Sequence, residues 1–370
     1  MTQLDPQARS LLEAMKASGQ RPLSTMPVPD ARRSRRRQLV VHPPRVQIAE
    51  AEDDLVPGPT GGIPVRWYRP SPEAGLPVTL YFHGGGWTVD DLDTHDHLCR
   101  RLASRAHAVV VSVAYRRGPE HPYPAAVEDA YAATMWVAAI GQERGVDPAR
   151  LAVADDSAGG NLATVVTLLC RDRRGPAVRF QALAYPVTDH WQAGRASYDQ
   201  YAGGYTLSGL PATLIITAEF DPLRDEGRAY AERLRAAGAA VEHVHLDDQM
   251  HGFLLQETTV DRAREAVDHF ADAFAEGSPE GRALGNRRHL AATDRKEIPD
   301  DAAAPAQRLS RPPPAPPADR RLRLGEHAMA VDEDQRAAQV AAGEQERLAG
   351  QRQDQGGGVD VAVVVSGPVS

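Results

Sequence analysis

The fold is decided at residues 151–163, which read LAVADDSAGGNLA. Residues 151–154 are a short apolar run typical of a buried strand, and residues 158–171 have the apolar spacing of a helix. Ser157 lies between them, within Asp156-Ser157-Ala158-Gly159-Gly160. A serine on a sharp strand-to-helix turn projects its hydroxyl above the sheet, with the helix N-terminus behind it. The alternative interpretation is an ordinary helix N-cap serine.

Outward from this turn, strand-like and helix-like segments alternate. Residues 108–114 form a continuous apolar run, as expected of a strand buried on both faces. The alternation predicts an α/β fold, with a mostly parallel sheet and helices on both faces. The predicted strands are 46–55, 63–68, 77–82, 108–114, 151–154, 180–185, 212–218 and 241–246, and the predicted helices are 125–140, 158–171, 224–237 and 260–275.

The composition divides the chain of 370 residues, whose length suggests two units. Phe274 is the last aromatic residue, so we expect a catalytic-type domain over 46–275 and a low-complexity, disordered tail over 276–370. A partner-binding segment and a non-native extension are alternatives for that tail. Before the domain, residues 1–45 are predicted to hold a helix, which Asp5 caps and Gly19 ends, and then a basic linker.

Charge and cysteine usage exclude several classes of protein. The net charge of -8 argues against a general nucleic-acid binder, so the five arginines within 31–37 are interpreted as a solvated surface segment. Two cysteines, Cys99 and Cys170, exclude a disulfide framework and a cysteine-based zinc site. We find neither a signal-peptide pattern nor an apolar run of 18 residues, and we expect a cytoplasmic protein without a membrane span.

A glycine-rich turn follows the predicted strand 77–82 and reads His83-Gly84-Gly85-Gly86-Trp87. Backbone N–H groups of such a turn, with the N–H of the residue after Ser157, can hold the negative oxygen of a tetrahedral intermediate. A phosphate cradle is disfavoured because neither GxxxxGK[ST] nor GxGxxG follows. A plain structural turn is the remaining alternative.

Two further residues complete a catalytic order. Asp221 follows the predicted strand 212–218, and His251 follows the predicted strand 241–246. The carboxyl ends of parallel strands meet at one edge of a sheet, where open α/β folds place their sites. Ser157, Asp221 and His251 therefore occur in the order expected of a Ser-Asp-His hydrolase, in which the histidine takes the serine proton and the aspartate orients it.

An acidic run with histidines follows the glycine-rich turn. Its spacing mixes both sides of one loop and fits a dedicated metal site poorly, so we expect no metal. The run consists of Asp90, Asp91, Asp93, His95, Asp96 and His97.

With these motifs in place, the chain resembles the hormone-sensitive-lipase-like family of α/β-hydrolases, in its bacterial esterase and acetyl-hydrolase branch. The resemblance runs from the N-terminal helix to about Phe274. It rests on HGGGW (83–87), YRRGPEHPYPAAVEDA (115–130), DSAGGNLA (156–163), ITAEFDPLRDEG (216–227) and MHGF (250–253).

The resemblance implies an α/β-hydrolase fold and a serine esterase that cleaves short-chain carboxylic esters without a cofactor. It implies a small-molecule ester as the partner and a cap that includes the N-terminal helix, and it leaves the oligomeric state open, with a dimer as one option. Esterase and amidase activity are not separated. The residues it implies are the catalytic Ser157, Asp221 and His251, the oxyanion-hole residues Gly85, Gly86 and Ala158, and the supporting His83, Gly84, Asp156 and Gly159.

Several positions depart from the family's pattern. Asp155 stands where the family has glycine two residues before the serine, and we expect it to crowd the residue two after the serine and to oppose the developing oxyanion. Asp90 and Asp248 also stand where relatives usually have glycine, and Ala114 and Arg117-Gly118 alter the family's DYRLAPE pattern before Glu120. Residues 186–211 form a short connection, which predicts a reduced cap, an open pocket and lower activity. The alternative function is therefore a catalytically impaired relative that binds a small ligand or a partner.

Overall fold

The computed structural model describes residues 2–19, 21–40, 46–189 and 207–275, all within one compact unit. The predictions for the tail, 276–370, and for most of the connection, 186–211, lie outside the described residues. The reduced cap and the disordered tail therefore stay predictions.

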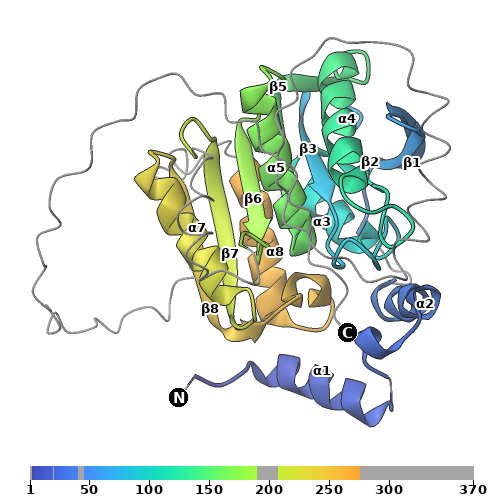
Figure 1. The fold of residues 1–370 in the computed structure, drawn as a ribbon, viewed down its shortest axis with the longest axis vertical. Helices are drawn as coiled ribbons and strands as arrows, with labels where there is room; N and C mark the ends of the chain where they lie inside the picture. The colour runs from blue at the N-terminus through green and yellow to red at the C-terminus, as the bar shows by residue number, and fades with distance from the viewer. Residues whose placement is uncertain (1, 20, 41–45, 190–206, 276–370) are drawn as a thin grey trace, which may run out of the picture. The chain divides into compact units, whose positions relative to one another are not determined.

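One mixed sheet organises the described part of the chain (Figure 1). Its eight strands lie in the order β1-β2-β4-β3-β5-β6-β7-β8. Strand β2 is antiparallel to its two neighbours, β1 and β4, and every pairing from β4 to β8 is parallel, which confirms the mostly parallel sheet. The strands are β1 Glu50–Gly58, β2 Gly61–Arg69, β3 Leu76–Phe82, β4 Val109–Val113, β5 Val146–Asp156, β6 Phe180–Ala184, β7 Ala212–Phe220 and β8 Val241–Met250.

Helices cover both faces of this sheet, as the alternating pattern predicts. Helices α4 Ala125–Ile140, α5 Ala158–Asp172 and α7 Arg224–Ala236 pack on one face. Helices α3 Asp96–Ala106 and α8 Asp261–Ala275 pack together on the other. Helix α3 was not predicted, because its first turn lies in the acidic run.

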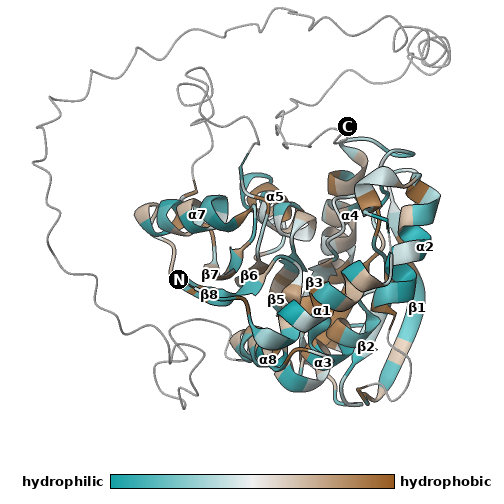
Figure 2. Cartoon of the chain, turned by 90° about the horizontal axis from the view of Figure 1, so that it is seen from below, coloured by the Kyte–Doolittle hydropathy of each residue, from teal (hydrophilic) through white to brown (hydrophobic). Residues whose placement is uncertain are grey.

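The core lies between these layers. Every residue of β4 and β6 is buried, as expected of a parallel strand covered on both faces. Phe180 of β6 meets Phe274 of α8 edge to face, with ring centroids 5.8 Å apart. Figure 2 shows β1 and α7 largely hydrophilic, in agreement with their place at the edge and surface of the sheet.

The N-terminal region consists of helices. The Asp5 side chain accepts from the N–H groups of Gln7 and Ala8, and so starts helix α1, Pro6–Ala17, as predicted. A short turn, η1 Leu23–Thr25, leads to helix α2, Val28–Leu39. The prediction of a linker over 31–37 is wrong, because these residues belong to α2. Three of the five arginines, Arg32, Arg35 and Arg36, pair with acidic groups of later loops, whereas Arg33 pairs with Asp30 of the same helix. Net charge alone hides such a local partnership.

None of the helices in the described ranges is both long and apolar enough to cross a membrane. The cytoplasmic location stays a prediction from the sequence.

Candidate active site

Ser157 sits on a sharp turn between β5 and α5. Its φ of 55° and ψ of -114° lie outside the regions that ordinary side chains favour, so the surrounding structure must hold the strain. The Ser157 N–H donates to the carbonyl of Ala184 at 2.9 Å, and its carbonyl accepts from the N–H of Val187 at 3.0 Å. The turn therefore has the geometry that the sequence predicted.

Two glycines allow α5 to start directly against the sheet. A Cβ on Gly159 would lie 1.9 Å from the Phe82 carbonyl oxygen, at the end of β3. A Cβ on Gly160 would lie 2.5 Å from the Pro186 Cβ. Because backbone atoms occupy the place of the Gly159 side chain, only glycine fits there, and this explains the glycine in the motif.

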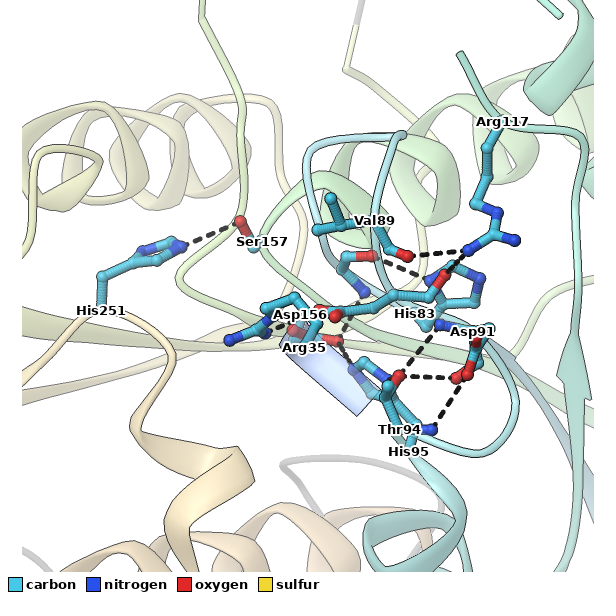
Figure 3. Close-up of polar contacts among 12 residues, drawn as sticks. Arg35, His83, Val89, Asp91, Thr94, His95, Arg117, Asp156, Ser157 and His251 are labelled. Carbon is cyan, nitrogen blue, oxygen red and sulfur yellow. Dashed lines mark hydrogen bonds and ion pairs between the residues drawn. The ribbon is translucent and has the colours of Figure 1, made fainter. Parts of the chain in front are cut away.

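The structure brings Ser157, Asp221 and His251 together at the carboxyl ends of β5, β7 and β8 (Figure 3 shows the serine and the histidine). Ser157 Oγ lies 3.0 Å from His251 Nε2, and His251 Nδ1 lies 2.9 Å from Asp221 Oδ2. The Asp221 side chain is fully buried, and its other oxygen accepts from the Leu223 N–H at 2.7 Å. The carboxylate is thus fixed at both oxygens, and it can fix the imidazole in turn.

An aromatic wall supports the histidine. The ring of the buried Tyr185 meets the His251 ring edge to face, with centroids 4.8 Å apart. The ring of Phe253, in the short helix η3 Phe253–Gln256, also meets the Tyr185 ring edge to face, with centroids 5.5 Å apart. His251 itself is one-third exposed, so it can reach both Ser157 and solvent.

Hydrogen bonds occupy the carbonyl groups of the glycine-rich turn. The His83 carbonyl accepts from the Tyr115 hydroxyl at 2.6 Å, and the Gly84 carbonyl accepts from His83 Nδ1 at 2.8 Å. The Gly85 carbonyl accepts from two backbone N–H groups, both at 3.0 Å. Hydrogen bonds to the carbonyl oxygens of residues 83–85 therefore fix the conformation of the turn.

Two N–H groups of the same turn, those of Gly85 and Gly86, have no acceptor among the described residues. In a planar trans peptide the C=O and N–H bonds point in opposite directions, so bonded Gly84 and Gly85 carbonyls turn the N–H groups of Gly85 and Gly86 the other way. Within the described ranges, neither N–H has an acceptor, and neither does that of Ala158. Free backbone donors beside a serine can stabilise a developing negative oxygen.

His83 is a neutral donor in this turn. Burial, together with the charge of the neighbouring His95, lowers its pKa to about 4. With Nδ1 bonded to the Gly84 carbonyl, the proton sits on Nδ1, and Nε2 has no partner in the part of the chain that the structure describes. Tyr115 stacks on the ring at a centroid distance of 4.4 Å. His83 thus fixes the peptide that carries the Gly85 N–H.

Asp156 anchors the turn from below. One of its oxygens accepts from the Gly84 N–H at 2.8 Å, the Tyr81 hydroxyl at 2.9 Å and His95 Nε2 at 3.0 Å. Burial would raise the pKa of Asp156, but His95 and the other donors hold it at about 2. Asp156 is therefore ionised, and His95, which the sequence analysis treated only as part of an acidic run, is its partner.

Asp155 is buried like its neighbour but differs from it in hydrogen bonding and in the direction of its pKa shift. It is fully buried, and neither of its oxygens has a hydrogen-bonding partner among the residues described. Burial, together with the charge of Asp156, raises its pKa well above the usual range, so the carboxyl is neutral. One oxygen lies 2.7 Å from where a Gly160 Cβ would be. The close contact of Asp155 is therefore with Gly160, the third residue after the serine, whereas the atoms nearest to a Cβ on Gly159 belong to Phe82 and His83.

The acidic run has no metal-like arrangement. In the described ranges, no group of three His, Cys, Asp or Glu residues could hold a metal ion. Its members instead pair with single side chains of the protein: Asp90 with Arg35, Asp91 and Asp93 with Arg36, Asp96 with Arg100 of the same helix, His95 with Asp156 and His97 with Glu257.

This fold and this site are those of an α/β-hydrolase, and comparison with known proteins leads to the same class. A family model described as the alpha/beta hydrolase fold matches residues 79–207 and 195–255. The chain is 41% identical to the carboxylic ester hydrolase LipN of Mycobacterium tuberculosis, over 68% of this chain and 77% of LipN. It is also 41% identical to the esterase LipI of the same organism, over 65% of this chain and 85% of LipI.

A solved structure of an esterase is similar to this chain as well. The hyperthermophilic esterase from the archaeon Pyrobaculum calidifontis has a TM-score of 0.67 and 37% identity, over 74% of this chain and 98% of that chain. The chain therefore belongs to the α/β-hydrolase family. Within that family, it is an ester hydrolase of the carboxylesterase type.

Proposed function

We propose that the chain cleaves carboxylic esters through an acyl-enzyme on Ser157, with His251 as the proton carrier and Asp221 as its orienting group. The observation that carries the proposal is the line of hydrogen bonds from Ser157 Oγ to His251 Nε2, and from His251 Nδ1 to Asp221. A free serine is a weak nucleophile, and an adjacent base in this geometry is what activates it.

The reaction has two halves. Ser157 Oγ attacks the ester carbonyl while His251 Nε2 takes the hydroxyl proton, and His251 then returns that proton to the leaving alcohol. The acyl group is left on Ser157. A water molecule, deprotonated by His251, attacks the acyl carbonyl, and the carboxylic acid leaves as the proton returns to Ser157 Oγ. Asp221 keeps the imidazole in the correct tautomer and stabilises the imidazolium.

The oxyanion formed in each half is assigned to the N–H groups of Gly85, Gly86 and Ala158. The support is that the C=O group of each of these three peptide units accepts a hydrogen bond, whereas its N–H group has no acceptor in the described part of the chain. One donor of an oxyanion hole contributes about 3 kcal/mol to transition-state stabilisation. We assign His83, Gly84, Asp156 and Gly159 to holding this arrangement, as the hydrogen bonds and close contacts above describe.

The test is the hydrolysis of p-nitrophenyl esters from acetate to laurate. We expect activity that falls with acyl length, and a loss of about 10⁴-fold or more in kcat for Ser157→Ala, because removing a triad member leaves only binding and the oxyanion hole. Ser10→Ala, on the exposed side of α1, is the matched control and should keep full activity. A Ser157→Ala variant that retains its activity would refute the assignment.

A further inference from the structure

Helix α2 contacts the loop that follows the glycine-rich turn 83–87, which is called the oxyanion turn below. Arg32 donates to the carbonyls of Thr88 and Gly118, both at 2.8 Å, and pairs with Glu120 at 2.7 Å. One turn further along the helix, Arg35 pairs with Asp90. Helix α2 thus contacts the loop after the oxyanion turn through its arginine side chains.

The Arg35–Asp90 pair is the buried one. Arg35 Nε and Nη2 donate to the two oxygens of Asp90 at 2.8 and 2.7 Å, a bidentate arrangement. The Asp90 side chain has 0% exposure. A carboxylate so far from water is costly unless it is paired, and removing one partner of such a pair is strongly destabilising. Asp90 therefore needs Arg35 in place.

Asp90 lies directly against the oxyanion turn. A Cβ on Gly85 would be 2.7 Å from the Asp90 nitrogen and 2.9 Å from the Asp90 Cβ. Gly85 also has a φ of +97°, a conformation that only glycine adopts readily. Any shift of Asp90 is thus transmitted at once to the peptide that carries a proposed oxyanion donor.

The backbone next to Asp90 is held by another arginine. Arg117 donates to the Val89 carbonyl at 2.7 Å, as Figure 3 shows, and also to the Asp90 carbonyl. In the same view Arg35 lies beside Asp156, whose negative charge also faces the Arg35 guanidinium. Asp90 and Arg117, two departures from the family pattern, are therefore parts of one arrangement.

We propose that Arg35 is a positioning residue for the oxyanion hole: through Asp90 it holds Gly85 in place, so that helix α2 completes the catalytic geometry. The proposal rests on the function assigned above to Gly85 and Gly86. The proposal also couples the packing of α2 to the order of the glycine-rich turn. If α2 moved away, the buried Asp90 carboxylate would lose its ion-pair partner.

The test compares Arg35→Met with Arg36→Met. Arg36 lies on the same helix and pairs with Asp91 and Asp93, but its side chain is 51% exposed. Misplacing an oxyanion donor acts on the transition state, so Arg35→Met should lower kcat about 10- to 100-fold with KM changed less than about threefold. Arg36→Met should stay within about threefold of the parent in both constants.

A second variant separates charge from packing. Asp90→Asn removes the carboxylate that Arg35→Met leaves unpaired, so the double variant Arg35→Met/Asp90→Asn should recover at least about tenfold of the lost kcat. If kcat of Arg35→Met matches that of Arg36→Met, or if the double variant is as slow as Arg35→Met alone, the proposal is wrong.

Amide hydrogen exchange gives a readout that does not depend on activity. The N–H groups of Thr88 and Val89 both donate to the Gly85 carbonyl, so they report on order in the turn. In Arg35→Met their exchange should rise at least tenfold, while that of the buried strand β6 is unchanged and Arg36→Met behaves as the parent. Unchanged exchange at 88–89 overturns the proposal even if the parent hydrolyses no ester, whereas absent hydrolysis with the expected exchange counts only against the proposed function.

Discussion

At the scale of single residues, two adjacent carboxyl groups behave in opposite ways. Asp156 is ionised because His95, Tyr81 and Gly84 surround it with donors, and Asp155 is neutral because it is buried without any such donor. A neutral Asp155 does not oppose a developing oxyanion. Ser157 Oγ remains 3.0 Å from His251, so the turn keeps its geometry with Asp155 in place.

The opposite pKa shifts predict opposite responses of stability to pH. The folded pKa of Asp155 is raised, so the folded state binds a proton that the unfolded state releases, and its stability falls as pH rises above about 4. Asp155→Asn has no such proton, and its melting temperature should gain on the parent's steadily from pH 4 to pH 8. A gap that stays constant over this range would contradict the neutral carboxyl.

For Asp156 the sign is reversed. Its folded pKa is lowered to about 2, so its contribution is fully present above about pH 4 and is lost as pH falls towards 2. The melting temperature of Asp156→Asn should therefore lie well below the parent's at pH 5 and approach it at pH 2 to 3. Thermal unfolding of both variants over one pH series makes the comparison, with each serving as the control for the other.

At the scale of elements, the sequence predicts those helices and strands whose apolar pattern is visible in the segment itself. Strand β4 was predicted because four of its five residues are valines, and α4 because its apolar spacing and length suffice. Helix α3 was missed because the polar run that leads into its first turn pairs with arginines far away in the sequence, namely Arg35, Arg36 and Arg66. Helix α2 was missed for the same reason, since its arginines find acids about 55 positions away.

Helix α3 should therefore behave as a core element. Leu102 is fully buried between α3 and its neighbours, so Leu102→Ala should cost about 2–5 kcal/mol of unfolding free energy. Leu55, on the edge strand β1, is 65% exposed, and Leu55→Ala should stay within about 0.5 kcal/mol of the parent. Urea unfolding measures both, and equal losses would contradict the assignment of α3 to the core.

At the scale of the whole molecule, the site collects residues that the sequence keeps far apart. Ser157 and His251 are 94 positions apart, yet their chain order and their places after strands were enough to predict that they meet. The fixed order of strands in this fold makes such predictions possible. No comparable rule pairs Arg35 with Asp90 or His95 with Asp156, because these contacts depend on how loops and the N-terminal helices pack.

The central claim is that Ser157 is the nucleophile of an ester hydrolase. The most direct measurement is mass spectrometry of the parent chain after reaction with an alkyl fluorophosphonate, a reagent that captures an activated serine. The account predicts one adduct per chain, on the peptide that contains Ser157, and labelling at least a hundredfold slower in His251→Ala. A folded chain that takes up no adduct, or carries it on another residue, would contradict the account.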